Sequence, residues 1–311
     1  MNAFVARRLG FMALSVLGAV TIAFLVMRLI PGDPAQVMLG DYATKESLAQ
    51  LRTRLGLDRP LLAQYVGFMV RALQGDFGTS LVTQRPAFDE VFAVFGPTMQ
   101  LAGAGVLVSM LIGIPTGIVA AAHRHRPADY LTMTLALGGM SMPVFWLGLL
   151  LLLVFSFVLG WTPSVGAGEG GFTNRLHHLV LPAVTLGLSL GAMVTRMTRS
   201  AMLEVIRQDY IRTARAKGLR ELSVVTKHAL RNAALPILTI VGVSFGVQLS
   251  GTVLVETVFA RPGMGSLLSS AIYQRDYPQV QALVAVFAAS IIVVNIAVDL
   301  LYGVLDPRVH A

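Results

Sequence analysis

The chain has 311 residues, of which 55% are hydrophobic and only 13% are charged, and it contains no cysteine. Soluble domains carry roughly 25% charged residues, so the composition argues against a soluble protein, and its hydrophobicity excludes a disordered chain. The absence of cysteine excludes a disulfide scaffold and a cysteine-ligated zinc or iron–sulfur site. The remaining class is a membrane protein with several spans.

Six apolar stretches are long enough to cross a bilayer as helices, which takes about 20 apolar residues. They run from 9 to 27, 97 to 122, 130 to 168, 176 to 195, 233 to 255 and 277 to 298, and the third is expected to be helical to about Leu159. The first stretch follows Arg7 and Arg8 as a signal peptide would. It is longer than the apolar part of a signal peptide and no A-x-A site follows it, so we predict an uncleaved helix.

Lysine and arginine predict the orientation of these spans, because cytoplasmic loops are enriched in both residues. If the N-terminus is cytoplasmic, the loops on that side carry the whole net charge of +8 and the opposite loops are neutral. Six spans then place both termini in the cytoplasm. The basic composition therefore needs no nucleic-acid partner, and no basic module interleaved with aromatic residues is present.

Residues 31–96, between the first two predicted spans, are too many for a plain connection. A turn cluster at 31–34 opens the segment, and Thr44 is expected to cap a short helix that Gly56 stops. A second helix is predicted from Pro60 to Leu73, with Leu62, Tyr65, Met69 and Leu73 on one apolar face and Gly75 at its end. We predict a helical cap that packs on the bundle, or else acts as a gate or docking surface. The chain then divides into residues 1–30, the cap at 31–96, and a five-helix core at 97–311.

Residues 196–232 form a polar loop on the cytoplasmic side of the predicted topology. The stretch from Glu204 to Lys217 lacks Gly and Pro, Gly218 is a candidate helix end, and Glu221 to Leu230 predicts a second helix. We therefore expect a helix–Gly–helix hairpin outside the membrane. It serves either to bind anionic lipid headgroups or as a rigid lever for a cytoplasmic partner.

The usual chemistry of catalysis and of ion coupling is missing. No phosphate-binding loop of the type GxxxxGK[ST] occurs, and the histidine pairs 123/125 and 177/178 have no acidic cluster beside them, so we expect no metal site. No Asp, Glu, Lys or Arg lies at the centre of a span, which argues against an ion-coupled carrier. Glu256 is placed at a helix end, where a charge costs little.

Residues 242–246 match the GxSxG motif of serine hydrolases, with Ser244 as the nucleophile. That motif needs a strand before the serine and a helix after it, whereas here it lies within one apolar helix. We favour close helix packing through Gly242, Gly246 and Ser250, which recur every four residues. This small-residue face lies either at a seam with another subunit, lining the pore, or within this chain.

The hairpin sequence resembles a known family. DYIRTARAKGL at 209–219 and HALRNAALP at 228–236 resemble the coupling loop of permeases from binding-protein-dependent ABC importers. Arg212 stands where the general pattern has Glu, Thr213 replaces its first Ala, and Gly218 matches. These departures resemble the dipeptide, oligopeptide and glutathione branch, as do the segments 28–34, 55–61, 75–78, 255–259, 261–265 and 275–278.

The resemblance implies an all-α membrane protein of the cytoplasmic (inner) membrane with the type I ABC importer permease fold and six transmembrane helices. It implies a homologous second permease subunit, two ATP-binding subunits that hold ATP and Mg, and an extracytoplasmic substrate-binding protein. The permease itself is then not an enzyme and binds no cofactor. The expected function is peptide import by alternating access, through a pore lined by the second, fourth and fifth spans.

The residues expected to couple this chain to an ATPase are Tyr210, Arg212, Ala214, Arg215, Lys217 and Gly218. The residues expected at an outer gate or docking surface are Glu256, Arg261, Gly263 and Asp276. The alternatives are a secondary carrier, which would transport alone on an ion gradient, and an intramembrane hydrolase, which would be labelled at Ser244.

Overall fold

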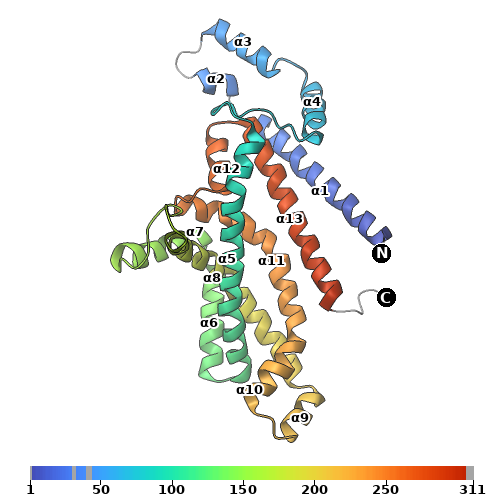
Figure 1. The fold of residues 1–311 in the computed structure, drawn as a ribbon, viewed down its shortest axis with the longest axis vertical. Coiled ribbons are helices and arrows are strands. Elements are labelled where there is room, and N and C mark those ends of the chain that lie inside the picture. Colours follow the sequence, from blue (N-terminus) through green and yellow to red (C-terminus); the bar gives the residue numbers. More distant parts are fainter. Residues whose placement is uncertain (1, 30–32, 40–43, 306–311) are drawn as a thin grey trace. The chain divides into compact units, whose positions relative to one another are not determined.

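The computed structural model describes residues 2–29, 33–39 and 44–305, and most of them are helical (Figure 1). In chain order the first elements are α1 (Asn2–Leu29), α2 (Pro34–Leu39), α3 (Lys45–Leu55), α4 (Leu61–Leu73), α5 (Ala87–Ala122), α6 (Pro127–Ser141), α7 (Val144–Leu151) and the π-helix η2 (Leu152–Val158). They are followed by α8 (Phe172–Ile206), α9 (Asp209–Ala216), α10 (Glu221–Ser223), the π-helix η3 (Val224–Ala229), α11 (Leu230–Val258), α12 (Met264–Tyr273) and α13 (Tyr277–Leu305). The described part contains no β-strand, so the predicted all-α class is confirmed. Residues 31 and 32 of the turn predicted at 31–34 lie outside the described residues.

Four helical stretches are long and apolar enough to cross a membrane, and they correspond to the second, fourth, fifth and sixth predicted spans. They are residues 87–122, 172–206, 221–258 and 277–298. The bent pair formed by α6 and α7–η2 makes a fifth span if it is counted as one. In α1 the apolar stretch among the described side chains, Leu14–Val26, is too short by itself to cross a membrane. The first predicted span therefore stays a prediction.

The third predicted span is helical to Val158, close to the end predicted at about Leu159, but it is not one continuous helix. α6 and α7–η2 are bent by 108° at the break between Ser141 and Val144. Met142 at the break is extended, with φ −84° and ψ 129°. It precedes Pro143, whose ring disfavours a helical residue before it and whose nitrogen cannot donate a hydrogen bond. The bend therefore has a local cause in the sequence.

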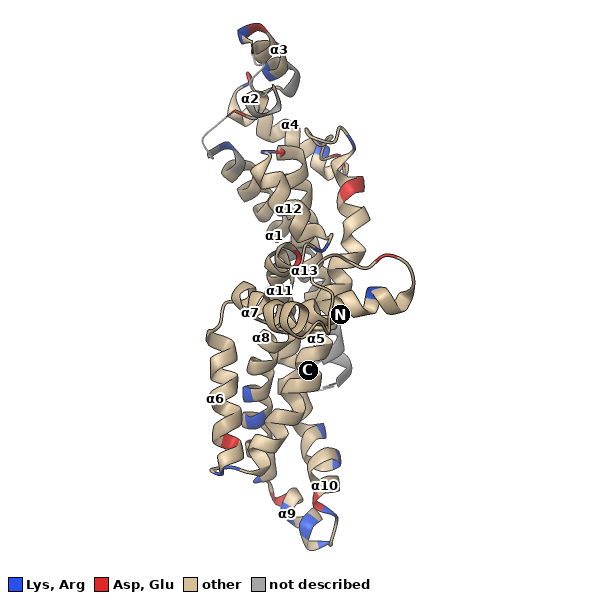
Figure 2. Ribbon diagram, turned by 90° about the vertical axis from the view of Figure 1, so that its left-hand side faces the viewer, with Lys and Arg blue, Asp and Glu red and all other residues tan. Residues whose placement is uncertain are grey.

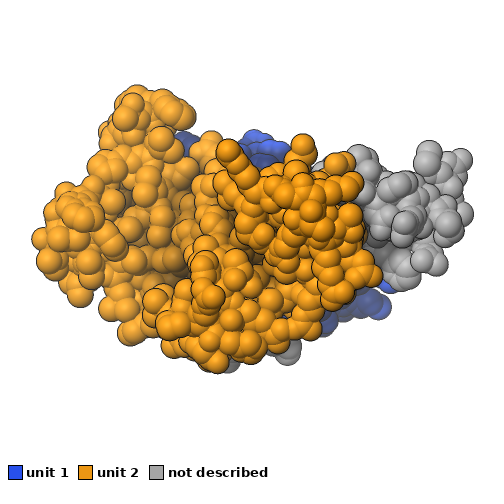
Figure 3. Space-filling view, turned by 90° about the horizontal axis from the view of Figure 1, so that it is seen from below, with its two compact units in different colours: residues 1–96, 263–292 blue, residues 97–262, 293–311 orange. Residues whose placement is uncertain are grey.

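The chain forms two compact units, coloured separately in Figure 3. The first unit comprises residues 1–96 and 263–292, and the second comprises residues 97–262 and 293–311. Helices α5 and α13 each contribute to both. The N-terminal segment and the cap that the sequence separated at residue 30 thus share a unit with α12 and the start of α13.

The helix ends predicted in the cap are present in the first unit. Thr44 and Ser47 form a reciprocal capping box at the start of α3. Gly56 follows α3 with φ +66°, a left-handed conformation that glycine adopts without steric cost.

The apolar face predicted for α4 is displaced in the structure. Tyr65 and Met69 pack beside a cluster formed by Val20, Phe24, Phe68 and Ala285, but Leu62 and Leu73 are 74% and 83% exposed. Phe68 stacks on Phe24 with ring centroids 5.6 Å apart. The face is therefore centred on Phe68, because this ring meets the aromatic side chain of α1.

The second unit is built on one large group of buried apolar side chains, which we call the main apolar cluster. It joins α5, α8, α9, η3 and α11, and its members are Ala121, Leu190, Val194, Ala201, Met202, Ile211, Ala214, Val224, Val225, Ala229, Ala233, Ile237 and Val241. A smaller cluster that includes Leu186, Val255 and Phe259 packs against α7 and η2.

Glycines bring α5 and α8 close together beside this cluster. A Cβ atom at Gly113 would lie 2.7 Å from Val194 Cβ, and one at Gly117 would lie 2.6 Å from the backbone oxygen of Thr195. Gly187 faces Val108 in the same way. These small-residue faces therefore pack within this chain, where only glycine lets the two backbones approach.

The face of α11 singled out in the sequence is divided. Gly242 packs against Val298 within the second unit. Gly246 is half-buried and Ser250 is exposed, with its hydroxyl donating to the Gly246 carbonyl oxygen at 3.3 Å. The first position thus serves packing within the chain, and the last remains on its surface.

Replacing Gly117 by Ala should destabilise the protein by about 1–3 kcal/mol, because the new methyl group meets backbone that cannot move aside cheaply. Gly103→Ala on the same helix is the matched control, since no atom lies within 4 Å of a Cβ there. Thermal unfolding of the purified variants in detergent measures both effects. Equal midpoints for the two variants would contradict the close approach of α5 and α8.

Candidate coupling helix and buried polar clusters

The hairpin begins with a break that the sequence did not predict. The Gly- and Pro-free stretch from Glu204 to Lys217 was expected to be helical throughout, but α8 ends at Ile206. Gln208 is extended, with φ −71° and ψ 150°, and α9 starts at Asp209. The acidic side chain of Asp209 lies in the first turn, where it is favourable to the helix dipole. α9 is therefore a separate short helix and not a continuation of α8.

One face of α9 is held against the rest of its own hairpin. Ile211 is fully buried and Ala214 is 7% exposed, and both belong to the main apolar cluster with Val224, Val225 and Ala229 of η3. Of the predicted coupling residues, Ala214 thus faces this chain. Tyr210, Arg212, Arg215 and Lys217 are exposed, with Tyr210 at 42%.

Gly218 ends α9 in a left-handed conformation, with φ +77°. Its N–H donates to the Arg215 carbonyl oxygen at 2.9 Å, and the Leu219 N–H donates to that of Ala214 at 3.4 Å. No atom lies within 4 Å of a Cβ built at this position. Glycine is therefore favoured by the backbone angle and not by lack of space.

An ion pair closes the turn around Gly218. Arg215 Nε and Nη2 donate to the two carboxylate oxygens of Glu221 at 3.1 and 2.7 Å. These hydrogen bonds raise the pKa of the Arg215 guanidinium. Both side chains are well exposed, so the pair contributes only about 0–1 kcal/mol to stability. The pair directs the Arg215 side chain toward Glu221 of the same hairpin, although the sequence predicted Arg215 as a contact for an ATPase.

Charged residues gather at the α9–α10 end of the second unit, whereas the apolar lengths of its helices are almost free of them (Figure 2). Within α9, Arg212 Nη1 donates to Asp209 Oδ1 at 3.2 Å, and both side chains are largely exposed. Lys217 and Arg220 have no ion pair among the described residues. The hairpin therefore presents a cationic surface on a firmly packed base.

Two of the four residues expected at an outer gate lie at the end of α11. Glu256 is fully buried, and its Oε1 accepts a hydrogen bond from Thr98 Oγ1 at 2.6 Å. Arg261 is 4% exposed, and its Nε and Nη1 have no partner among the described residues. Burial lowers the pKa of Arg261, and the nearby Glu256 carboxylate opposes that shift. Glu256 thus lies near the end of α11, as the sequence predicted, but its side chain is fully buried.

The other two expected gate residues begin helices of the first unit. Gly263 precedes α12, and its N–H donates to Ser266 Oγ at 3.0 Å. Asp276 is 2% exposed and precedes α13; its Oδ1 accepts from the Gln279 N–H at 3.2 Å and its Oδ2 from Ser80 Oγ at 2.5 Å. Both residues thus have local helix-capping contacts, and neither lies on the surface.

Two family models together match almost the whole chain. The family described as the binding-protein-dependent transport system inner membrane component matches residues 113–311, and the corresponding N-terminal family matches residues 1–102. The chain belongs to this family. It is therefore a permease subunit of an ABC importer and a multi-pass protein of the inner membrane.

Full-length relatives support this assignment. The permease is 42% identical to the di/tripeptide transport system permease protein DppB of Pseudomonas aeruginosa, over all of this chain and 99% of the relative. It is 43% identical to the glutathione transport system permease protein GsiC of Salmonella paratyphi A, over the same shares. An inward-facing structure of the MetNI methionine ABC transporter covers 70% of this chain and 96% of its own at a TM-score of 0.56 and 17% identity, which shows a shared fold.

The GxSxG alternative does not fit the permease structure. The residues on both sides of Ser244 are helical, so the strand that a nucleophile elbow requires is absent there. Ser244 is 6% exposed, and its Oγ lies 3.8 Å from Met193 Sδ. The side chain therefore packs between α11 and α8.

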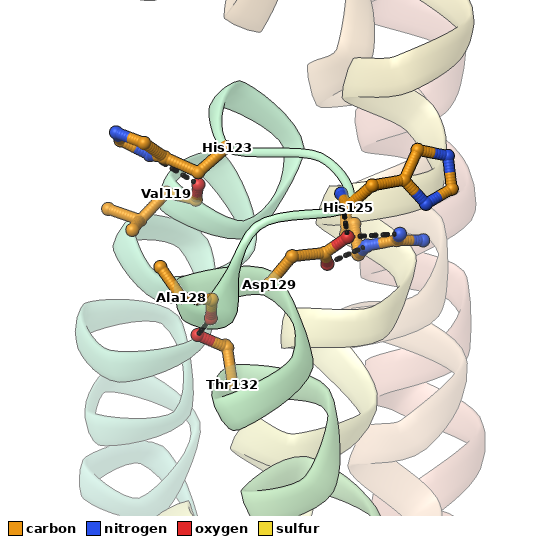
Figure 4. A network of polar contacts seen from close by, with 7 residues as sticks. Val119, His123, His125, Ala128, Asp129 and Thr132 are labelled. Carbon is orange, nitrogen blue, oxygen red and sulfur yellow. Dashed lines mark hydrogen bonds and ion pairs between the residues drawn. The ribbon is translucent and has the colours of Figure 1, made fainter.

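A partly buried ion pair that the sequence did not predict joins α6 to α8 in the permease (Figure 4). Arg199 Nε and Nη2 donate to the two carboxylate oxygens of Asp129 at 2.6 and 2.8 Å. Asp129 Oδ2 also accepts from the His125 N–H at 3.0 Å, and its side chain is only 3% exposed. The two residues lie 70 positions apart, so only their charges were visible in the sequence.

Asp129→Asn should destabilise the permease by about 1.5–3 kcal/mol, because it removes the charge-assisted hydrogen bonds to the partly buried Arg199. Asp209→Asn is the matched control, since it breaks the exposed pair with Arg212 and should cost under about 1 kcal/mol. Unfolding of both variants by denaturant in detergent gives the difference. The assignment of Asp129–Arg199 as a structural pair fails if Asp129→Asn costs no more than Asp209→Asn.

Proposed function

We propose that this permease moves peptides into the cytoplasm and that its hairpin at 196–232 docks on separate ATPase subunits. The observation that carries the proposal is the construction of α9. One face is buried in the main apolar cluster, and the other presents Tyr210, Arg212 and Lys217 to solvent. An exposed cationic face on a rigid base suits a protein partner that pushes on it.

The main apolar cluster supplies the connection from that surface to the spans. It contains Ile211 of α9, Val224 of η3, Met202 of α8 and Ile237 of α11. Close-packed side chains cannot be compressed, so a displacement of α9 has to move the ends of α8 and α11 with it. Closure of a pair of ATPases on ATP would in this way open the pore to the outside, and hydrolysis would reset it.

The proposed assembly has the partners that the family resemblance implies. A homologous second permease completes the pore, two ATP-binding subunits hold ATP and Mg, and an extracytoplasmic binding protein delivers the substrate. The hairpin then lies in the cytoplasm with both termini, in agreement with the excess of Lys and Arg on that side.

Peptides are the proposed substrates because of the relatives. The DppB and GsiC permeases are named for di- and tripeptide transport and for glutathione transport. We propose a short peptide for this permease, with the choice among peptides made largely by the separate binding protein. Identification of the ligand that copurifies with that protein tests this assignment.

Gly218→Val should abolish substrate-stimulated ATP hydrolysis while the complex still assembles. A β-branched residue strongly disfavours φ near +77°, so the turn between α9 and α10 has to change. Gly218→Asn is the control, because asparagine tolerates the left-handed region, and it should retain most of the stimulation. The variants are compared as reconstituted complexes in proteoliposomes; normal stimulation in Gly218→Val would rule out the lever.

Charge reversal on the exposed face of α9 should weaken the attachment of the ATPases. Arg212→Glu combined with Lys217→Glu is expected to reduce their copurification with the permease at least tenfold, because attraction becomes repulsion. Arg124→Glu, in the exposed loop before α6, is the control and should leave copurification unchanged. An unchanged yield in the double variant would place the ATPase contact elsewhere.

A further inference from the structure

The first unit contains a cavity of about 300 Å³ that the proposed import cycle does not use. Its walls come from α1, the connection between α3 and α4, α4, the segment 76–81 and the start of α13, all within the first unit. This volume is at the lower end for small-molecule sites in proteins, which begin near about 300 Å³. It has room for a small ligand and not for a long peptide.

Three arginines line the cavity, one each from α1, α4 and the connection between α3 and α4. They are Arg28, Arg59 and Arg71. Arg28 Nε and Nη2 donate to Gln64 Oε1 at 3.0 and 2.9 Å, while its Nη1 is buried with no partner among the described residues. None of the three arginines forms an ion pair with a described carboxylate. The cavity therefore has an excess of positive charge.

Two acidic side chains near this site, Asp76 and Asp33, have partners of their own. Asp76, which also lines the cavity, accepts the Gly78 N–H at 2.8 Å. Asp33 pairs with Arg52 at 2.6 Å. Gln64, whose Oε1 binds Arg28, uses its Nε2 for the carbonyl oxygens of Leu57 and Arg59. These contacts hold the cationic wall in place without neutralising it.

Aromatic rings form the other part of the wall. Phe24, Phe68, Phe77 and Tyr277 all line the cavity. Phe24 is stacked on Phe68, and the Arg28 guanidinium lies 3.9 Å from the Phe24 ring centroid. Phe24, Phe68 and Tyr277 are almost completely buried, with exposures of 0%, 5% and 8%, so the partly exposed Phe77 is the ring that offers surface to a ligand. The cavity thus combines guanidinium groups with an apolar surface.

We propose that this cavity binds a small amphipathic anion, with a carboxylate or phosphate group at the arginines and an apolar part against Phe77. Guanidinium groups bind both oxyanions through charge-assisted hydrogen bonds. The chemistry has two sources in a membrane: the C-terminal carboxylate of a short peptide and the phosphate of an anionic lipid. Arg28 lies in the last turn of α1 and Tyr277 in the first turn of α13, at the ends of two apolar helices.

The test uses the full-length permease and has two arms. In the first, the protein in phosphatidylcholine nanodiscs is titrated by calorimetry with N-acetyltrialanine, which is an anion, and with N-acetyltrialanine amide, which lacks the carboxylate and is neutral. In the second, native mass spectrometry compares retention of phosphatidylglycerol and phosphatidylcholine on the detergent-purified protein. We expect the charged probe of at least one pair to bind at least tenfold more tightly than its zwitterionic or amidated partner, and the arm that responds identifies the source.

Variants separate this site from general attraction of anions. Arg59→Gln and Arg71→Gln should each weaken the responding probe about tenfold. Both side chains are exposed at the cavity rim, so folding should be retained. Arg85→Gln is the control, since Arg85 belongs to the same unit, is exposed and does not line the cavity.

The proposal is overturned if neither charged probe is preferred, or if Arg59→Gln and Arg71→Gln bind it as the unmodified protein does. A loss of equal size in Arg85→Gln overturns it too, because that result indicates attraction by net charge alone. The readout is binding by the permease, so its result is independent of ATPase coupling through Gly218.

Discussion

The burial of Ile211 and Ala214 against η3 is the contact on which the proposed coupling depends. A helix of eight residues is too short to be stable alone in water, so α9 exists because one of its faces is covered. Burying a side chain such as Ile211 contributes roughly 1.5–3 kcal/mol. The same contact decides that Tyr210 and Arg212 point outward. Stability of the helix and presentation of its outer surface therefore have one cause.

Within the second unit, two different kinds of contact hold helices α5, α6 and α8 together. In a membrane the hydrophobic effect does not drive helices together, because lipid tails are as apolar as the side chains. Close packing and polar contacts therefore hold the helices together. Glycines at 113, 117 and 187 let α5 and α8 approach at backbone distance. Asp129 and Arg199 join α6 to α8 through two hydrogen bonds. The result is a closely packed bundle, which the proposed transmission of a displacement from α9 requires.

Arginine has opposite roles in the two units. In the hairpin of the second unit, Arg215 is exposed and paired with Glu221, in a region that presents positive charge to its surroundings. In the first unit, Arg28 lines a small cavity and lies on the ring of Phe24, with one nitrogen unpartnered. The guanidinium group serves both settings because it stays charged when buried and stacks on aromatic rings. An exposed cationic surface suits a large partner, and a cavity of about 300 Å³ suits a small anion.

The sequence by itself determined the elements whose causes are local. Hydropathy predicted four of the long apolar helices, the Thr44 cap and the glycines at 56 and 218 predicted helix ends, and the motif at 209–219 indicated the family. The 108° bend was also encoded locally, by Pro143, although the apolar composition hid it. Only the tertiary structure decided that Ala214 faces inward, that Glu256 is buried beside Thr98, and that Asp129 meets Arg199. It alone brought Arg28, Gln64 and Tyr277 around one cavity. These contacts join residues up to about 250 positions apart, and hydrogen bonds and packing act over only a few ångströms, so no pattern of neighbours along the chain records them.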